Sequence, residues 1–170
     1  MNEMIEEAKN GNKIAFTNLI LEKKSTLYKI AKSRLRNTAD IDDAIQNTMI
    51  NAYLNLKKLK NNDRFDVWIT RILINECNAV YRKNKVVCIS YEEIEDYQVS
   101  SNPDSTDSKI EYDKIMNFLE YNQRIFIVLY YGAGYTTKQM SEILNMNENT
   151  IKTNLRRIKE KLQNEFKGGM

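Results

Sequence analysis

Apolar residues recur every three or four positions through most of the first 85 residues. This spacing places them on one face of an α-helix. The apolar pattern of residues 40–59 begins at Asp40, which suits the N-cap position because its carboxylate can accept a backbone hydrogen bond. The patterns predict four helices, over residues 2–9, 14–35, 40–59 and 64–82. We expect these helices to pack into one module that ends at residue 85.

Residues 86–109 interrupt this periodicity. The segment is acidic and rich in serine, and it contains Pro103, the only proline of the chain. Such a composition cannot bury enough apolar surface to offset the entropy lost on ordering. We therefore expect a flexible acidic linker, with one weak turn at residues 92–97.

Helical periodicity resumes near residue 110. It predicts one continuous helix that ends at Gly132 or Gly134, because glycine accepts the left-handed conformation common at helix ends. Residues 125–131 are rich in strand-forming side chains, but one isolated strand would have no partner among helices. We therefore expect this stretch to be helical as well.

Two helices joined by a tight turn are predicted next. Thr136 or Thr137 caps the first, which ends at Leu144. Residues 145–147 form the turn, and the second helix covers residues 148–166. This arrangement is typical of a helix-turn-helix. The alternative is an ordinary helical hairpin with a solvated basic face.

The predicted fold is all-α, with small helical modules at residues 1–85 and 110–170. The formal net charge of the chain is +3, but the charge is unevenly distributed. Residues 1–85 carry 16 basic and 10 acidic groups, residues 86–123 carry 2 and 9, and residues 124–170 carry 8 and 4. This division predicts two modules that tolerate a polyanion, joined by a segment that resembles one.

The predicted last helix has two different faces. Its apolar face consists of Ile151, Leu155, Ile158 and Leu162. The opposite face carries hydrogen-bond donors in its first half: Asn149, Lys152, Thr153, Asn154, Arg156 and Arg157. Lysine, arginine and asparagine can bond base edges in the major groove, and threonine can contact a thymine methyl group. The helix is therefore a candidate for reading duplex DNA.

The composition excludes several classes of protein. The chain has no histidine, so Cys77 and Cys88 cannot complete an ordinary four-ligand zinc site. It also has no glycine-rich phosphate loop and no nucleophile motif. We expect no enzyme, no metal and no cofactor, and we expect two reduced thiols. No apolar run is long enough to span a membrane, which favours a soluble cytoplasmic protein.

Two stretches of the sequence resemble a known family. "DDAIQNTMINAYLNL" followed by "RFDVWITRILINECNAVYRKNK" resembles domain two of the extracytoplasmic function (ECF) group of bacterial sigma factors, and residues 114–166 resemble domain four. The resemblance implies a factor that binds core RNA polymerase and directs promoter-specific initiation. Domain four would read the minus-thirty-five element, and domain two would open the minus-ten element. The alternative is a helix-turn-helix regulator that acts without being a polymerase subunit.

The resemblance also implies which residues bind. Polar residues of the 40–59 helix would contact the clamp coiled coil of the β′ subunit: Asp42, Asp43, Gln46, Asn47 and Asn51. The loop at residues 60–65 and Asn75 would form a pocket for a flipped base, and basic groups would hold phosphates. This downstream set comprises Arg64, Phe65, Arg71, Asn75, Arg82 and Lys83. Trp68 lies on the apolar stripe, and we expect it to pack in the core rather than to stack on a base.

Further partners follow from the same resemblance. The upstream promoter element would be read by the donor face of the last helix, with Arg157 placed for phosphate. The polymerase contacts would include the β flap, and an anti-sigma factor would hold the two modules with a helix wedged between them. The acidic linker would occupy the RNA channel, or would serve only as a tether. No small-molecule substrate is implied.

Overall fold

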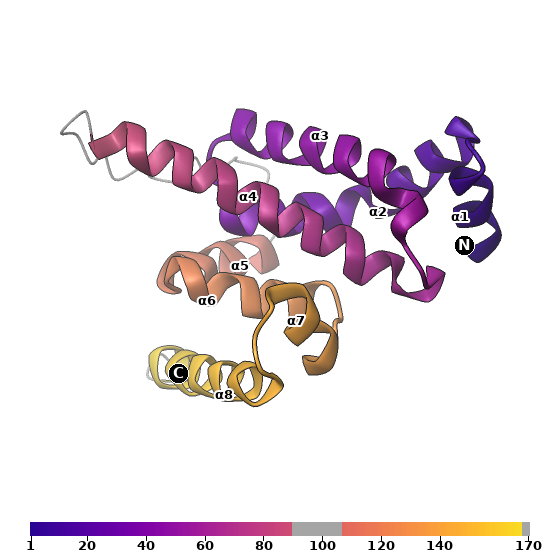
Figure 1. Cartoon of the computed structure of the whole chain (residues 1–170). Coiled ribbons are helices and arrows are strands. Elements are labelled where there is room, and N and C mark those ends of the chain that lie inside the picture. Colours follow the sequence, from indigo (N-terminus) through magenta and orange to yellow (C-terminus); the bar gives the residue numbers. More distant parts are fainter. Residues whose placement is uncertain (90–106, 168–170) are drawn as a thin grey trace.

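A computed structural model describes residues 1–89 and 107–167 of the chain. Every regular element in these residues is helical (Figure 1). The first module contains α1 (Asn2–Lys9), α2 (Lys13–Arg34), α3 (Thr38–Asn55), two 3-10 turns (Leu56–Lys58 and Asn62–Arg64) and α4 (Phe65–Ile89). The second contains α5 (Asp107–Phe118), α6 (Tyr121–Ile127), a π-helical turn (Val128–Gly132), α7 (Thr137–Leu144) and α8 (Glu148–Lys167). The predicted all-α fold is confirmed, whereas the predicted turn at residues 92–97 lies outside the described residues.

The side chain of Asn37 fixes the start of α3. The backbone is extended at this residue, and its Oδ1 accepts a hydrogen bond of 2.8 Å from the N–H of Ala39. The prediction that Asp40 is the N-cap is therefore wrong. Asp40 lies in the first turn of α3, where its carboxylate accepts a 2.7 Å hydrogen bond from the amide of Asn84 on α4. The contact joins the start of α3 to the second half of α4.

Two helices of the first module end at residues other than those predicted. α3 ends at Asn55, and the chain then forms a 3-10 turn that buries Leu56 in the core. α4 continues beyond Arg82 to Ile89. No glycine or proline lies between these two residues, so nothing in the local sequence interrupts the helix.

The prediction of one continuous helix from residue 110 is wrong, because the chain breaks between α5 and α6. The backbone is extended at Glu120, whose N–H donates a 3.3 Å hydrogen bond to Oε1 of Gln123. Such a contact belongs to a capping box, which starts a new helix. Leu119 is 1% exposed and anchors the break in the core. Residues 125–131 are helical as predicted, with a π-helical turn at their end.

α7 and α8 form the predicted helix-turn-helix. The hydroxyl of Thr136 accepts a 3.2 Å hydrogen bond from the N–H of Gln139 and so caps α7. The helix ends at Asn145, which takes a left-handed conformation with φ of 52°. Oδ1 of Asn147 then accepts a 2.8 Å hydrogen bond from the N–H of Asn149 and starts α8. Local capping thus sets the length of the turn between the two helices.

The apolar faces of both modules form one core cluster. The largest fully buried side chains are Ile5, Leu19, Leu27, Ile30, Leu56, Phe65, Ile69 and Leu73 in the first module and Leu119, Leu129, Met140 and Ile151 in the second. Cys77 is also fully buried, and burial raises the pKa of its thiol to about 12. The predicted reduced thiol is confirmed for Cys77, while the side chain of Cys88 lies outside the described part of the structure.

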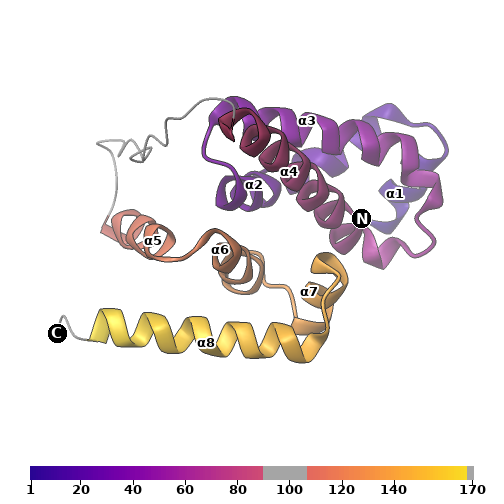
Figure 2. The same cartoon turned by 60° about the vertical axis from the view of Figure 1, so that its left-hand side comes forward.

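The two modules pack directly against each other. α4 contacts α7, and α2 contacts α6 (Figures 1 and 2). The ring of Tyr121 stacks on that of Tyr81 with centroids 4.2 Å apart, and the guanidinium of Arg34 lies 4.0 Å from the centre of the Tyr121 ring. The hydroxyls of Tyr135 and Thr70 are hydrogen-bonded at 2.7 Å. These contacts hold the modules together without a third partner between them.

Tyr121→Ala should loosen the contact between the modules, because it removes an aromatic stack and a cation–π contact that are together worth about 1–3 kcal/mol. Small-angle X-ray scattering of the free protein should then give a larger radius of gyration. Tyr121→Phe is the matched control, since it keeps the ring and removes a buried hydroxyl that has no hydrogen-bond partner among the described residues. An unchanged radius for Tyr121→Ala would contradict this role of the ring.

Candidate nucleic-acid interface

The donor face of α8 is exposed in the first half of the helix. Ile151 and Ile158 are 0% and 1% exposed on the opposite face, where α8 contacts α6 and α7. Both views place α8 on the side of the second module away from α3 (Figures 1 and 2). Four of the predicted DNA-binding side chains are exposed on it: Asn149, Lys152, Arg156 and Arg157.

Two of the predicted donors already have partners in their own helix. The hydroxyl of Thr153 donates to the carbonyl of Asn149 at 2.8 Å. The amide of Asn154 donates to the carbonyl of Thr150 at 2.9 Å. Both side chains are only half-exposed. A direct base contact by Thr153 or Asn154 must therefore compete with a bond to the carbonyl four residues earlier.

Glu148 connects the starts of α7 and α8. Its carboxylate accepts a 2.7 Å hydrogen bond from the hydroxyl of Thr137 and pairs with Lys152 at 3.0 Å. The hydrogen bond from the Thr137 hydroxyl is the main reason that the pKa of Glu148 lies below its usual range, and the contact with Lys152 lowers it further. The ionised carboxylate fixes α8 relative to α7 and holds the ammonium of Lys152 near the start of α8. Further along α8, Arg156 pairs with Glu160 at 3.5 Å.

A second set of predicted DNA-binding residues lies along α4. Arg71, Asn75 and Arg82 are exposed, and their spacing of four and seven residues places them on one face of the helix. Lys83 is exposed as well. The contacts of α4 with the second module involve Thr70 instead, so the face with Arg71 stays open while the modules are packed together.

The two predicted residues at the start of α4 have other partners. Phe65 has no exposed surface, so its predicted place in the DNA-binding set is corrected: it is a core residue that no base can reach. Its ring packs beside Trp68 with centroids 6.0 Å apart. Arg64 is partly exposed and forms a 3.2 Å ion pair with Glu142 of α7. Arg64, a candidate phosphate contact, is thus paired with a residue of the second module.

A hollow of about 350 Å³ lies between the end of α3 and the first half of α4. It is lined by Asn51, Asn55, Lys58, Trp68, Ile72, Asn75 and Glu76. Trp68 is half-buried, so it packs on the core as expected and also forms a wall of the hollow. The predicted pocket combined Asn75 with the loop at residues 60–65, whereas this hollow includes Asn75 and none of the loop.

Four lining residues were not predicted from the sequence: Asn55, Lys58, Ile72 and Glu76. A signal for most of them was present. Residues 51, 55 and 58 recur at i, i+4 and i+7, and residues 68, 72 and 75 do the same. When two neighbouring antiparallel helices each carry such a stripe, the two stripes can face each other. The sequence does not show how the two helices are aligned, and this alignment creates the hollow.

The predicted polymerase-binding residues of α3 separate into two groups. Asp42, Asp43, Gln46 and Asn47 are exposed on α3. Asn51 instead is half-buried, and its amide donates a 2.7 Å hydrogen bond to Glu76 of α4. Ile50 and Leu54, which were not predicted from the sequence, are 57% and 69% exposed on the same helix. The exposed surface of α3 is therefore both polar and apolar.

Within residues 1–89 and 107–167, no group of three or more cysteine, aspartate or glutamate side chains is arranged to hold a metal ion. In the same part of the chain, no helix combines the length and the apolar character needed to cross a membrane.

Comparison with known proteins adds independent observations. The sequence model of Sigma-70 region 2 matches residues 19–86, and that of Sigma-70 region 4 matches residues 109–162, together more than two thirds of the chain. The chain is 24% identical to the ECF RNA polymerase sigma factor SigW of Bacillus subtilis, over 96% of this chain and 95% of that protein. It is also 24% identical to the ECF RNA polymerase sigma factor SigM of Mycobacterium tuberculosis, over 89% and 77%. The chain belongs to the ECF sigma factors.

Two solved structures share the fold of this chain. CnrH, in complex with the cytosolic domain of CnrY, matches with a TM-score of 0.72 at 21% identity, over 99% of this chain and 98% of CnrH. RpoE of Bartonella quintana, in complex with the anti-sigma factor NepR, matches with a TM-score of 0.77 at 22% identity, over 91% and 98%. Both alignments are long enough to include both modules.

As an ECF sigma factor, the chain associates with RNA polymerase and initiates transcription. The match to region 2 disfavours a helix-turn-helix regulator that acts without polymerase, because such a regulator would need only the second module. Sigma factors are in general DNA-binding initiation factors rather than enzymes.

Proposed function

We propose that this ECF sigma factor divides promoter recognition between its two modules. α8 reads the upstream, minus-thirty-five element, and the first module holds the minus-ten element open. The observation that carries the proposal is that each module buries its apolar faces and leaves one face of donors exposed, on α8 and on α4.

The upstream element is read by the first half of α8. Asn149, Lys152 and Arg156 offer the side chains that recognise adenine or guanine in the major groove, and Arg157 lies beside them for phosphate. Each good base contact discriminates by about 1–3 kcal/mol, so three contacts are enough for a short element. The exposed ion pair of Lys152 with Glu148 costs little to break when DNA offers phosphates and base acceptors instead.

The downstream element is held at the hollow between α3 and α4. A base flipped from the non-template strand would stack on Trp68, and the amides of Asn51, Asn55 and Asn75 would bond its polar edge. Stacking of a base on an aromatic ring is worth about 1–3 kcal/mol. Arg71 and Arg82, on the exposed face of α4, would hold the backbone.

The exposed surface of α3 is the proposed contact with the clamp coiled coil of β′, and the second module would reach the β flap. Asp42, Asp43, Gln46 and Asn47 supply carboxylates and amides. Ile50 and Leu54 add apolar area that a coiled coil can cover. An interface of this mixed character combines orientation by polar groups with burial of apolar surface.

The modules must separate on the promoter. A compact chain of this length has a radius of gyration near 15 Å and a diameter of about 40 Å. The centres of elements named for positions minus thirty-five and minus ten lie about 25 base pairs apart, roughly 85 Å at 3.4 Å per pair. The packed arrangement cannot reach both elements, so it corresponds to a factor that has not yet engaged a promoter.

A partner that binds the packed arrangement would keep the factor off polymerase. CnrH and RpoE, whose folds this chain shares, were solved with CnrY and with the anti-sigma factor NepR. We extend this to the present chain: an anti-sigma factor holds it in the cytoplasm, and the chain itself acts by binding and not by catalysis. The physical basis is mass action, since a partner selective for the packed form removes the form that spans the promoter.

Asp43→Lys should weaken binding to core RNA polymerase, because it reverses the charge of an exposed side chain on the proposed docking surface. Gln46→Ala should act in the same direction with a smaller effect. Glu22→Lys, an equal charge reversal at an exposed site on α2, is the matched control. Affinity would be measured with purified core enzyme and fluorescently labelled factor. Equal affinities for Asp43→Lys and the control would exclude this docking surface.

Lys152→Ala and Arg157→Ala should have different effects on DNA binding by the holoenzyme. Lys152→Ala should relax the preference at one base pair of the upstream element by about 1–3 kcal/mol. Arg157→Ala should weaken all sequences alike and lower the slope of log affinity against log salt by about one. A uniform loss of affinity in both variants would refute the proposed reading face.

Trp68→Ala should reduce the fraction of promoter held open, because the flipped base loses its stacking surface, a loss of about 1–3 kcal/mol. Trp68→Phe keeps an aromatic face and should retain most of the activity. Permanganate reactivity of unpaired thymines in the downstream element measures opening, and thermal unfolding verifies that both variants fold. Wild-type opening by a folded Trp68→Ala protein would show that Trp68 serves the core alone.

A further inference from the structure

The loop before α4 has no apolar side chain of its own. Leu59 and Phe65 flank it and are buried, whereas the five residues between them are all polar: Lys60, Asn61, Asn62, Asp63 and Arg64. Apolar packing cannot fix the conformation of these five residues, because none of them contributes an apolar side chain to the core. Polar contacts must therefore decide where its side chains point.

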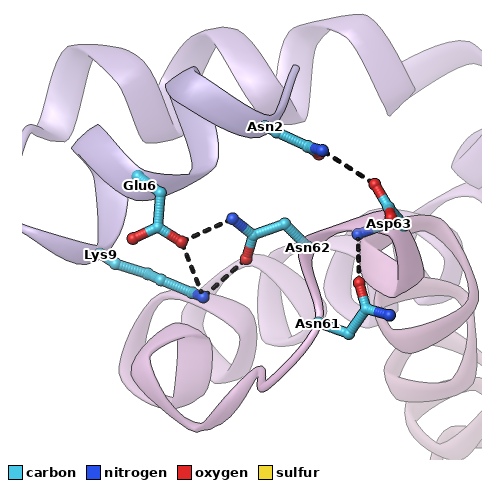
Figure 3. Close-up of polar contacts among 6 residues, drawn as sticks. All are labelled: Asn2, Glu6, Lys9, Asn61, Asn62 and Asp63. Atoms are coloured by element: carbon cyan, nitrogen blue, oxygen red, sulfur yellow. Dashed lines mark hydrogen bonds and ion pairs between the residues drawn. The ribbon is translucent and has the colours of Figure 1, made fainter.

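One face of α1 provides these contacts. Residues 2, 6 and 9 recur at i, i+4 and i+7, and each of them bonds the loop (Figure 3). The amide of Asn2 donates to Oδ1 of Asp63 at 2.8 Å. On another face, Ile5 is fully buried and anchors the helix to the core. α1 thus has one face for the core and one for the loop.

Asn62 is held at both ends of its amide. Lys9 donates to its Oδ1 at 2.6 Å, and its NH₂ group donates to Oε1 of Glu6 at 2.5 Å (Figure 3). Lys9 and Glu6 are themselves paired at 3.3 Å. The bonds from Asn62 and then Lys9 hold the pKa of Glu6 below its usual range, so the carboxylate is ionised at neutral pH. This closed set of donors and acceptors permits one orientation of the Asn62 side chain.

The contacts with α1 lie wholly within the first module. The other long-range contact of this loop, between Arg64 and Glu142, joins it to the second module. That ion pair must break when the modules separate on a promoter. The bonds from Asn2, Glu6 and Lys9 can persist, and with the bond from the N–H of Asp63 to Oδ1 of Asn61 they keep the loop ordered.

We infer that α1 is a positioning element for reading the downstream promoter element. Through Glu6 and Lys9 it fixes Asn62, and so directs Lys60 and Asn61, which are exposed, toward the non-template strand. This inference rests on the proposed function, in which the first module holds that strand. It assigns a role to a helix that precedes the segment matched by the Sigma-70 region 2 sequence model, which begins at residue 19.

The test removes the contacts from the α1 side and leaves the loop sequence unchanged. The double variant Glu6→Ala/Lys9→Ala loses both bonds to Asn62. The matched control Glu3→Ala/Lys13→Ala also removes one acid and one base, at exposed positions that make no side-chain contact with the loop. Each holoenzyme is assayed by abortive initiation on promoters that carry single base substitutions in the downstream or the upstream element. Binding to core polymerase and thermal unfolding are measured alongside.

We expect Glu6→Ala/Lys9→Ala to lower the discrimination between bases about threefold or more at one or two downstream positions. Discrimination at the upstream element and affinity for core enzyme should match those of the control. Glu6→Gln, whose amide oxygen can still accept from Asn62, should recover most of the discrimination. Unaltered downstream discrimination, or an equal loss of activity on every promoter with a lower melting temperature, would overturn the positioning role.

The loop variant Asn61→Ala separates this inference from the proposed function. If Asn61→Ala lowers downstream discrimination and Glu6→Ala/Lys9→Ala does not, the loop reads DNA and only the role of α1 is wrong. If neither variant changes it, the loop does not read the downstream element and the positioning role of α1 is wrong, whereas the proposed role of the hollow is decided separately by Trp68→Ala.

A readout without polymerase tests the contact itself. In the free wild-type protein, the two side-chain NH₂ protons of Asn62 should give separate, slowly exchanging NMR signals. In Glu6→Ala/Lys9→Ala these signals should move toward those of a solvated amide, and in the control they should not. Solvated-amide signals in the wild-type protein would overturn the inference, because the bonds would then not be formed.

Discussion

The packing of α4 between α3 and the second module is the constraint on which the other surfaces depend. One side of α4 meets α3 through Glu76 and Asn84, and another meets the second module through Thr70 and Tyr81. α2 covers a further part of α4, and the exposed face is left for Arg71 and its neighbours. A single helix thus carries a wall of the hollow, the exposed donors and the contact with the second module.

The sequence was sufficient for most of the helices and for the donor face of α8, because both follow from a period of 3.6 residues. The exposed residues of α4 were implied by the family resemblance instead. The sequence was less informative where capping competes with periodicity. Glu120 and Gln123 start a new helix inside a continuous apolar pattern, and Asn37 rather than Asp40 caps α3. It failed for the hollow, which depends on how α3 and α4 are aligned, because no local pattern records that alignment. The burial of Phe65 follows from its spacing with Trp68 and Ile72, whereas its place in the DNA-binding set came only from the family resemblance.

The contact between the modules includes specific polar and aromatic interactions beside the apolar core cluster that both modules share. Tyr121, Arg34 and Tyr135 supply interactions that are each worth a few kcal/mol at most. These are the interactions that single substitutions can remove without changing the core of either module. The ion pair between Arg64 and Glu142 links the contact between the modules to the loop that α1 supports.

We propose that this chain selects promoters as a subunit of polymerase and reads two separate elements. Selection of random duplex DNA with the purified chain, in the presence and absence of core RNA polymerase, tests it most directly. Enriched sequences should appear only with core enzyme, and they should contain two conserved blocks at a fixed spacing. A single block enriched equally well without core enzyme would contradict it.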